Sequence, residues 1–275
     1  MQAKHSSYMT GFKPVLLVIT LLFAISCQKS ERIFLDIDFE NAKSWHYLLG
    51  VDIKGKVTPD SIPQLFSSSL RTYLQGGISP VNKKVITLKT EQTRINSDFL
   101  VEQEIRNLEQ QFDNVSLLFS PKDGALNLID TTDMPVVNIG GWDLFRSFAK
   151  VLPVFPEAPV GPGDKWDRDR QFPIQTNHGD AIGHLYQSFI FDSVYQSTSR
   201  FAAVSWKFSY RIELINPDTS GTLDNLPQAG RGTGRVLLDL TSKRISSAHA
   251  EFDVPITDDY PGMSWKEVVH MEIIE

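Results

Sequence analysis

The sequence predicts a mainly β protein built from antiparallel strands. Apolar and polar residues alternate along several segments, most regularly from Val204 to Leu214. This period of two is typical of a strand with one buried face and one solvated face. Polar turns separate many of these segments, and in Pro121-Lys-Asp-Gly124 the Asp-Gly pair supplies the positive φ that a tight hairpin needs. With 275 residues, 41% of them apolar and 22% charged, the composition is that of a folded globular protein.

Residues 1–26 are predicted to be a lipoprotein signal peptide. Lys4 and Lys13 precede an apolar run from Val15 to Ile25, which is shorter than the ~20 residues that span a bilayer as a helix. The run ends in Ala24-Ile-Ser-Cys27, which resembles the lipobox of bacterial lipoproteins. We therefore expect the Cys27 thiolate to take a diacylglyceryl group, with residues 27–32 as a lipidated tether. The alternative is an ordinary cleaved signal peptide that happens to end in cysteine.

Charge and cysteine content exclude several classes of function. Cys27 is the only cysteine, so lipidation leaves no thiol for a disulfide, a metal or nucleophilic catalysis. Removal of residues 1–26 takes two lysines and no acids, which leaves 27 − 2 = 25 basic and 33 acidic residues, a net charge of −8. This argues against nucleic acid as a partner and against electrostatic docking on anionic lipid. The acyl chains then provide the membrane attachment, and Gln28, by analogy with the enterobacterial sorting rule, favours the outer membrane.

Residues 33–139 form a β-rich first half that also contains one helix. Residues 98–112 have apolar side chains at helical spacing, with Ser97 or Asp98 as the expected N-cap. Alternation predicts strands on both sides of this helix, the first two joined as a hairpin through Glu40-Asn-Ala-Lys43. The predicted strands are Ile33–Phe39, Trp45–Ile53, Leu65–Leu74, Val85–Ile95, and a hairpin of Leu117–Ser120 with Ala125–Ile129.

Residues 140–166 are predicted to contain an aromatic helix followed by a hinge. The predicted apolar stripe of the helix is stopped by Pro153, and the Pro- and Gly-rich stretch Phe155–Trp166 then joins the two halves, with Trp166 anchoring the next strand. The aromatic residues of this helix can line a pocket for an apolar ligand, or they can fill the core, as most apolar helix faces do. The stripe consists of Trp142, Phe145, Phe148, Val151 and Leu152.

Residues 167–275 form a β-rich second half of the same domain. The glycines of Gly230-Arg-Gly-Thr-Gly234 are interpreted as structural, letting a strand bend, because the Lys-Ser/Thr of a phosphate-binding loop is missing. Alternation predicts the strands Leu185–Val194, Val204–Leu214, Arg235–Leu240, Ile245–Ile256 and Trp265–Ile274.

No residue pattern predicts a metal, a cofactor or an active site. His178, Asp180 and His184 lie within seven residues, and His270 shares a strand face with Glu272, but neither spacing matches a known metal site. No nucleophile elbow or His-Glu-x-x-His motif is present. We therefore predict no cofactor, no metal and no enzymatic activity.

The order of features resembles a family of uncharacterised bacterial cell-envelope lipoproteins. The resemblance rests on the lipobox, on Phe155-Pro156, on Pro159-Val160 followed by Gly163-Asp164-x-Trp166, and on Gly232-x-Gly234 ahead of Asp239. Pro162 departs from the family motif and is expected to alter the loop more than the fold. With this resemblance, the expected fold is a strongly curved antiparallel sheet or half-barrel with one or two packed helices.

Two functions follow as hypotheses. The first is non-enzymatic binding of an apolar or amphipathic ligand between helix and sheet, with Trp142, Phe145 and Phe148 as ligand-binding residues. The alternative is an interaction or assembly subunit of an envelope complex, which presents a strand edge or a loop to a partner protein. An apolar cavity of ~300–1,000 Å³ beside the helix is expected for the first, and an exposed apolar patch for the second.

Overall fold

The computed structural model describes residues 31–58, 62–80, 82, 84–122, 125–129, 151–176, 179–214, 229–254 and 263–274. The chain divides into two units, Met1–Arg32 and Ile33–Glu275, and every element below belongs to the second unit. The signal peptide, Cys27 and the aromatic residues Trp142, Phe145 and Phe148 lie outside the described residues. Among the described residues, no helix is long and apolar enough to cross a membrane.

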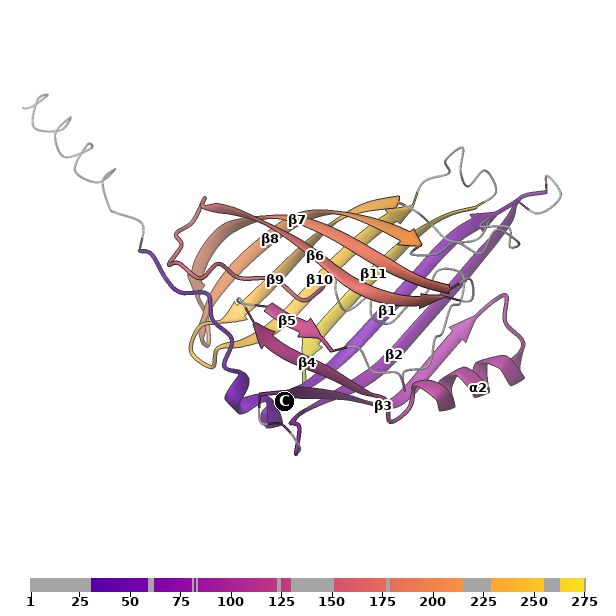
Figure 1. Cartoon of the computed structure of the whole chain (residues 1–275), viewed down its shortest axis with the longest axis horizontal. Helices are drawn as coiled ribbons and strands as arrows, with labels where there is room; N and C mark the ends of the chain where they lie inside the picture. Colours follow the sequence, from indigo (N-terminus) through magenta and orange to yellow (C-terminus); the bar gives the residue numbers. More distant parts are fainter. Residues whose placement is uncertain are drawn as a thin grey trace, which may run out of the picture. The chain divides into compact units, whose positions relative to one another are not determined.

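The second unit is built on one antiparallel sheet of eleven strands, strongly curved and not closed (Figure 1). This confirms the predicted mainly β fold. The strands are β1 (His46–Val57), β2 (Gln64–Ile78), β3 (Ile86–Ser97), β4 (Ser116–Lys122), β5 (Ala125–Leu128), β6 (Lys165–Thr176), β7 (Gly179–Gln196), β8 (Arg200–Leu214), β9 (Ala229–Asp239), β10 (Arg244–Val254) and β11 (Met263–Ile273).

Strand order follows the sequence around the sheet, with one break. The order is β5-β4-β3-β2-β1-β11-β10-β9-β8-β7-β6, so each strand pairs with its sequence neighbours except at β5 and β6, which are the two edges. The first and last strands pair over their full length, from Tyr47 with Ile273 to Val57 with Met263. Residues 129–164 therefore connect one edge of the sheet to the other.

Alternate residues of most strands form a buried inner face, and on the edge strand β6 the inner residues Trp166, Arg168 and Arg170 are half-buried. Leu49, Val51 and Ile53 of β1 are almost fully buried, and the same alternation continues through β8 with Val204, Trp206 and Phe208. Each large apolar side chain buried in this way contributes ~1.5–3 kcal/mol relative to an exposed one. The opposite face, called the outer face below, carries most of the charged side chains of the strands.

Helix α2 (Glu102–Phe112) covers an edge of β3 that β4 leaves unpaired. The Glu109 carboxylate accepts the Ile95 N–H at 2.9 Å, and the Asp113 carboxylate accepts the Thr93 N–H at 2.5 Å. The helix was predicted, but its expected N-cap was wrong. The N-cap is Val101, whose N–H is accepted by Glu104 at 3.1 Å.

The predicted strand Ile33–Phe39 and its hairpin are wrong. Only Ile33 forms a bridge, to Val160, and residues 39–44 form the 3₁₀ helix η1 (Phe39–Ser44) in place of the turn. Leu35 and Ile37 are buried as their alternation predicts. They pack onto the core as an extended segment, because β1 pairs with β2 and β11 on its two sides.

Residues 151–164, which precede the edge strand β6 in the sequence, pack into the core. Val151 and Leu152, the end of the predicted apolar stripe, are buried together with Val154 and Phe155. The Trp166 indole N–H donates to the Val154 carbonyl at 2.7 Å, so the start of β6 holds this segment.

Candidate ligand-binding face

A cluster of aromatic residues covers part of the inner face of the second half. Trp166 stacks on Phe189 at 5.3 Å between ring centroids, and Phe189 contacts Trp206 at 5.7 Å. Aromatic side chains contribute large apolar areas with a fixed shape, so this face of the sheet is rigid and hydrophobic. The inner aromatic cluster consists of Trp166, Phe189, Trp206, Phe208, Tyr210 and Phe252.

A glycine ladder on β9 makes room for these rings. Tyr210, Phe208 and Trp206 of β8 pair in register with Gly230, Gly232 and Gly234 of β9. A Cβ at Gly234 would lie 2.2 Å from the Trp206 ring, and one at Gly232 would lie 2.5 Å from the Phe208 ring. The strand register is unbroken at all three glycines. The aromatic rings occupy the space that a Cβ would take, so they lie against the backbone of β9.

Three side chains on this face bury hydrogen-bonding atoms without a partner among the described residues. They are Gln187, with both amide atoms, and the indole N–H groups of Trp206 and Trp265. Gln187 is fully buried and pairs in register with Phe208, so its amide lies within the inner aromatic cluster. A buried polar group without a partner costs ~1–3 kcal/mol.

Buried polar groups in the first half are satisfied. Thr72 and Thr93 bond to each other at 3.0 Å, and Ser68 donates to the Asn96 carbonyl at 3.3 Å. Thr90 donates to the Phe112 carbonyl. Within the part of the chain that the structure describes, the remaining unpaired buried atoms lie on the second half of the sheet. Those of Gln187 and Trp206 are on the adjacent strands β7 and β8, and that of Trp265 is three strands farther, on β11.

The guanidinium of Arg170 lies beside residues 151–164. Arg170 on β6 donates to the Leu152 carbonyl at 3.2 Å. Burial lowers the pKa of Arg170 to about 10, so the guanidinium is still charged at neutral pH. It adds a second bond between β6 and residues 151–164.

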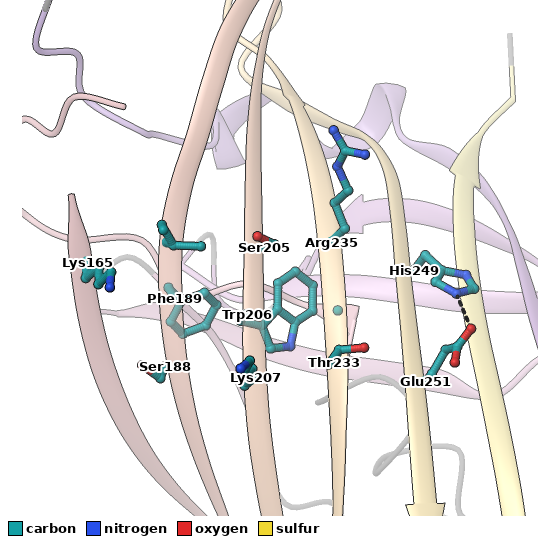
Figure 2. A pocket seen from close by; sticks show the side chains of 12 residues that line it. Lys165, Ser188, Phe189, Ser205, Trp206, Lys207, Thr233, Arg235, His249 and Glu251 are labelled. Carbon is teal, nitrogen blue, oxygen red and sulfur yellow. Dashed lines mark ion pairs between the residues drawn. The ribbon is translucent and has the colours of Figure 1, made fainter. Parts of the chain in front are cut away.

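The outer face of β6 to β10 is hollowed into an open groove of about 600 Å³ (Figure 2). Its floor is made of short side chains, including Ser188, Ser205 and Thr233, and longer charged side chains stand around it. The charged and titratable members of this outer groove are Lys165, Lys207, Arg235, His249 and Glu251. A neighbouring hollow of about 530 Å³ shares Lys207, Thr233 and Glu251 and continues toward Lys266.

The histidines considered as metal ligands have other neighbours. His184 lies 3.1 Å from a Glu213 carboxylate oxygen, and His178 is outside the described residues. His270 lies over Gly50, where a Cβ would be 2.1 Å from the ring. Among the described residues, no group of three or more His, Cys, Asp and Glu side chains is placed to hold a metal ion.

No family model and no curated protein sequence matches this chain. Weak structural likenesses include lipovitellin, from work on its lipid–protein interactions (10% identity, TM-score 0.48, 84% of this chain and 25% of that chain). Another is the hypothetical lipoprotein YmcC from Escherichia coli, at 10% identity and a TM-score of 0.31, covering 97% of this chain and 98% of that chain. A third is the LolA superfamily protein NE2245 from Nitrosomonas europaea, at 10% identity and a TM-score of 0.21, covering 86% of this chain and 90% of that chain. This chain thus spans about a quarter of the lipovitellin chain. At these TM-scores the function must be argued from the residues themselves.

The residues that stand out in the structure differ from those predicted as a binding site. The buried alternation of Trp206, Phe208 and Tyr210 is visible in the sequence, and so is the glycine spacing of residues 230–234. Their pairing is not visible, because it depends on register. Gln187 occupies a buried position of a strand with alternating apolar residues. A polar residue at such a position was the signal in the sequence that could have identified it as a candidate binding residue.

Proposed function

We propose that this chain is a lipid-anchored protein of the bacterial envelope that binds an amphipathic ligand against its inner face and catalyses no reaction. The observation that carries the proposal is the Gln187 amide, fully buried in the inner aromatic cluster with both polar atoms unpaired. A ligand with one polar group and an apolar body satisfies this surface. Its polar group bonds to the amide, and its apolar body packs on the rings.

Hydrogen-bond energetics favour such a ligand over a purely apolar one. Native proteins pair the large majority of their buried polar atoms, so the exceptions at Gln187 and Trp206 on adjacent strands call for an explanation. A ligand hydroxyl, ester or carboxyl group that accepts from the Trp206 indole and the Gln187 amide removes the cost of leaving them unpaired. Phe189, which contacts Trp206 and neighbours Gln187 on the inner face of β7, packs beside that polar group.

Residues 151–164 provide a route for entry. They lead into the edge strand β6, which holds Leu152 and Val154 through the Arg170 and Trp166 side chains. Backbone hydrogen bonds to Ile33 and Phe191 fix residues 160–164, so the movable part is residues 151–155. Displacement of residues 151–155 releases these two side-chain bonds and exposes the buried side chains of Val151, Leu152, Val154 and Phe155, which opens the inner face. Trp142, Phe145 and Phe148 precede it, and we propose that they contact the apolar part of the ligand.

Lipidation of Cys27 places this binding face at a membrane. Acyl chains hold the protein beside a source of amphipathic molecules, and Gln28 favours the outer membrane as the site. Attachment through two or more acyl chains is stable, whereas a single chain gives marginal binding. The proposed role is therefore to hold or pass on an amphiphile within the envelope.

Native mass spectrometry of the full lipidated chain, purified from bacterial envelopes in detergent, tests this function. We expect one non-covalent amphiphile per chain in the wild type and in the control Gln171→Met, which changes an exposed residue of β6. Gln187→Met should lose the amphiphile and remain folded by circular dichroism. Equal occupancy in all three proteins, or none in any of them, would overturn the proposal.

A second candidate is an interaction subunit, and an exposed apolar patch favours it. Leu65 is 83% exposed, Val101 64% and Phe99 45%. The Asp98 N–H donates to the Ser67 carbonyl at 3.1 Å, which brings the start of β2 beside the chain leading into α2. Patches of this kind mark surfaces for protein partners.

Photocrosslinking in intact cells tests this second function. A crosslinking amino acid at Leu65 should capture one discrete envelope protein, whereas the same amino acid at Tyr195, which is 39% exposed, should not. Identical products from both positions would argue against a partner at this patch.

A further inference from the structure

We propose that the outer groove binds an acidic oligosaccharide, a glycan chain whose phosphate, sulfate or carboxylate groups contact Lys165, Lys207 and Arg235. The groove lies on the face of the sheet opposite the inner aromatic cluster, so this site is independent of the proposed amphiphile. The two binding sites can exist together, and an experiment can disprove one of them without affecting the other.

The charge of the outer groove is opposite to that of the chain. The whole chain has a net charge of −6, whereas the groove contains three cations, Lys165, Lys207 and Arg235, and one anion, Glu251. Among the described residues, none of these three cations takes part in an ion pair with an acid. Lys207 and Arg235 lie diagonally across the neighbouring strands β8 and β9, so one anionic ligand can interact with both charges.

The acid of the groove is already engaged. Glu251 pairs with Lys266, and it lies 3.5 Å from His249 (Figure 2). The Lys266 hydrogen bond, together with that of His249, holds the pKa of Glu251 below its usual range against a smaller opposing effect of desolvation. Glu251 is therefore ionised and neutralised by its own partners, and the three cations remain available to a ligand.

The spread of the cations calls for an extended ligand. Lys165, Ile190, Ser205 and Arg235 occupy one row across four adjacent strands. Strands lie ~4.8 Å apart, so the row places Lys165 and Arg235 ~14 Å from each other at the backbone. Lys207 stands in the next row, opposite Ser188 and Thr233. A chain with repeated anionic groups matches three cations spread over two rows and four strands better than a single phosphate does.

The floor of the groove suits a sugar better than a nucleobase. Ser188 and Thr233 present hydroxyl groups that can bond to sugar hydroxyls. The aromatic residues beneath, Phe189 and Trp206, are 1% and 2% exposed, so they offer no surface for base stacking. A flat membrane surface contacts the cations at the rim and leaves the hydroxyl floor unused.

Calorimetric titration of the full chain in detergent with a heparin hexasaccharide tests the proposal, with neutral maltohexaose as the comparison. We expect saturable binding of the heparin hexasaccharide, weakened by added salt, and no binding of maltohexaose. The double variant Lys207→Gln/Arg235→Gln should bind at least tenfold more weakly. The control Lys43→Gln/Lys84→Gln removes the same charge at exposed positions outside the groove and should bind within twofold of wild type.

Three outcomes would overturn the proposal. The first is equal weakening by both double variants, which would indicate an effect of net charge alone. The second is no binding by the wild type at millimolar hexasaccharide. The third is binding to anionic phosphatidylglycerol vesicles that depends on Lys207 and Arg235 without any binding of the hexasaccharide, which would make the groove a membrane contact.

Discussion

The Trp206 ring on β8 lies across Gly234 on β9, its partner in register, so that a Cβ at Gly234 would come within 2.2 Å of the ring. This contact keeps a large aromatic side chain flat against the wall of the sheet. It also fixes the direction of the Trp206 indole N–H, one of the buried donors without a partner.

Gly234→Ala should destabilise the protein by ~1–3 kcal/mol, because overpacking of a well-packed site forces rings out of their positions. Gly77→Ala is the control, since the atom it would meet is the rotatable Thr87 hydroxyl oxygen at 2.5 Å. We expect a loss of less than about 1 kcal/mol there. Urea denaturation of both variants measures the difference, and equal losses would argue against the ring contact.

Gln187→Met should stabilise the ligand-free protein while it abolishes amphiphile binding. Methionine has nearly the same length and shape, and it removes two unpaired buried polar atoms that together cost ~1–3 kcal/mol or more. The midpoint of denaturation in urea should therefore rise. A clear loss of stability would mean that the Gln187 amide has a partner within the folded chain.

Trp166→Phe should loosen residues 151–164 more than it affects the rest of the protein. The change keeps an aromatic ring against Phe189 and removes the indole bond to the Val154 carbonyl, worth ~0.5–1.5 kcal/mol. Amide hydrogen exchange should become faster in residues 151–160. Trp206→Phe is the matched control, because its indole N–H has no partner among the described residues, and it should leave exchange in residues 151–160 unchanged.

Stability should decrease as the pH falls below about 6.5, and His270 should account for part of the decrease. Burial lowers the pKa of His270, and the charge of Arg71 lowers it further, while Asp52 and Glu272 oppose the shift. The unfolded chain therefore takes up a proton before the folded chain does, which favours unfolding in this pH range. Above the ordinary histidine pKa both states are neutral, and the effect disappears.

Urea denaturation at pH 7.5 and pH 5.5 checks this effect, with His270→Gln as the test variant. The variant should lose less stability between the two pH values than the wild type does. His46, which is exposed at the start of β1, provides the control through His46→Gln, because His249 faces His270 in register and its charge itself lowers the pKa of His270. The account of His270 is wrong if both variants retain the full dependence on pH.

The sequence predicted the sheet well wherever alternation was long and the turns were polar. The segment Val204–Leu214 alternates without interruption, and it lies within β8. The same signal was misleading at Ile33–Phe39, because alternate burial of Leu35 and Ile37 does not require a partner strand. An extended segment that packs on a core gives the same pattern as a strand.

The candidate site depends on relationships that periodicity does not contain. Strand register alone brings Trp206 to Gly234 and Lys165 into a row with Arg235. A shift of one residue would send each of these side chains to the other face. The predicted ligand-binding residues Trp142, Phe145 and Phe148 lie outside the described residues, and their role stays a prediction.

The most direct test of the inner binding face is nuclear magnetic resonance of the indole N–H groups during titration with lauric acid below its micelle concentration. The chain has five tryptophans, so single Trp→Phe variants can assign every indole resonance. We predict saturable shifts of the Trp206 indole resonance that are lost in Gln187→Met and kept in Gln171→Met. An unchanged Trp206 resonance at saturating lauric acid would contradict the account.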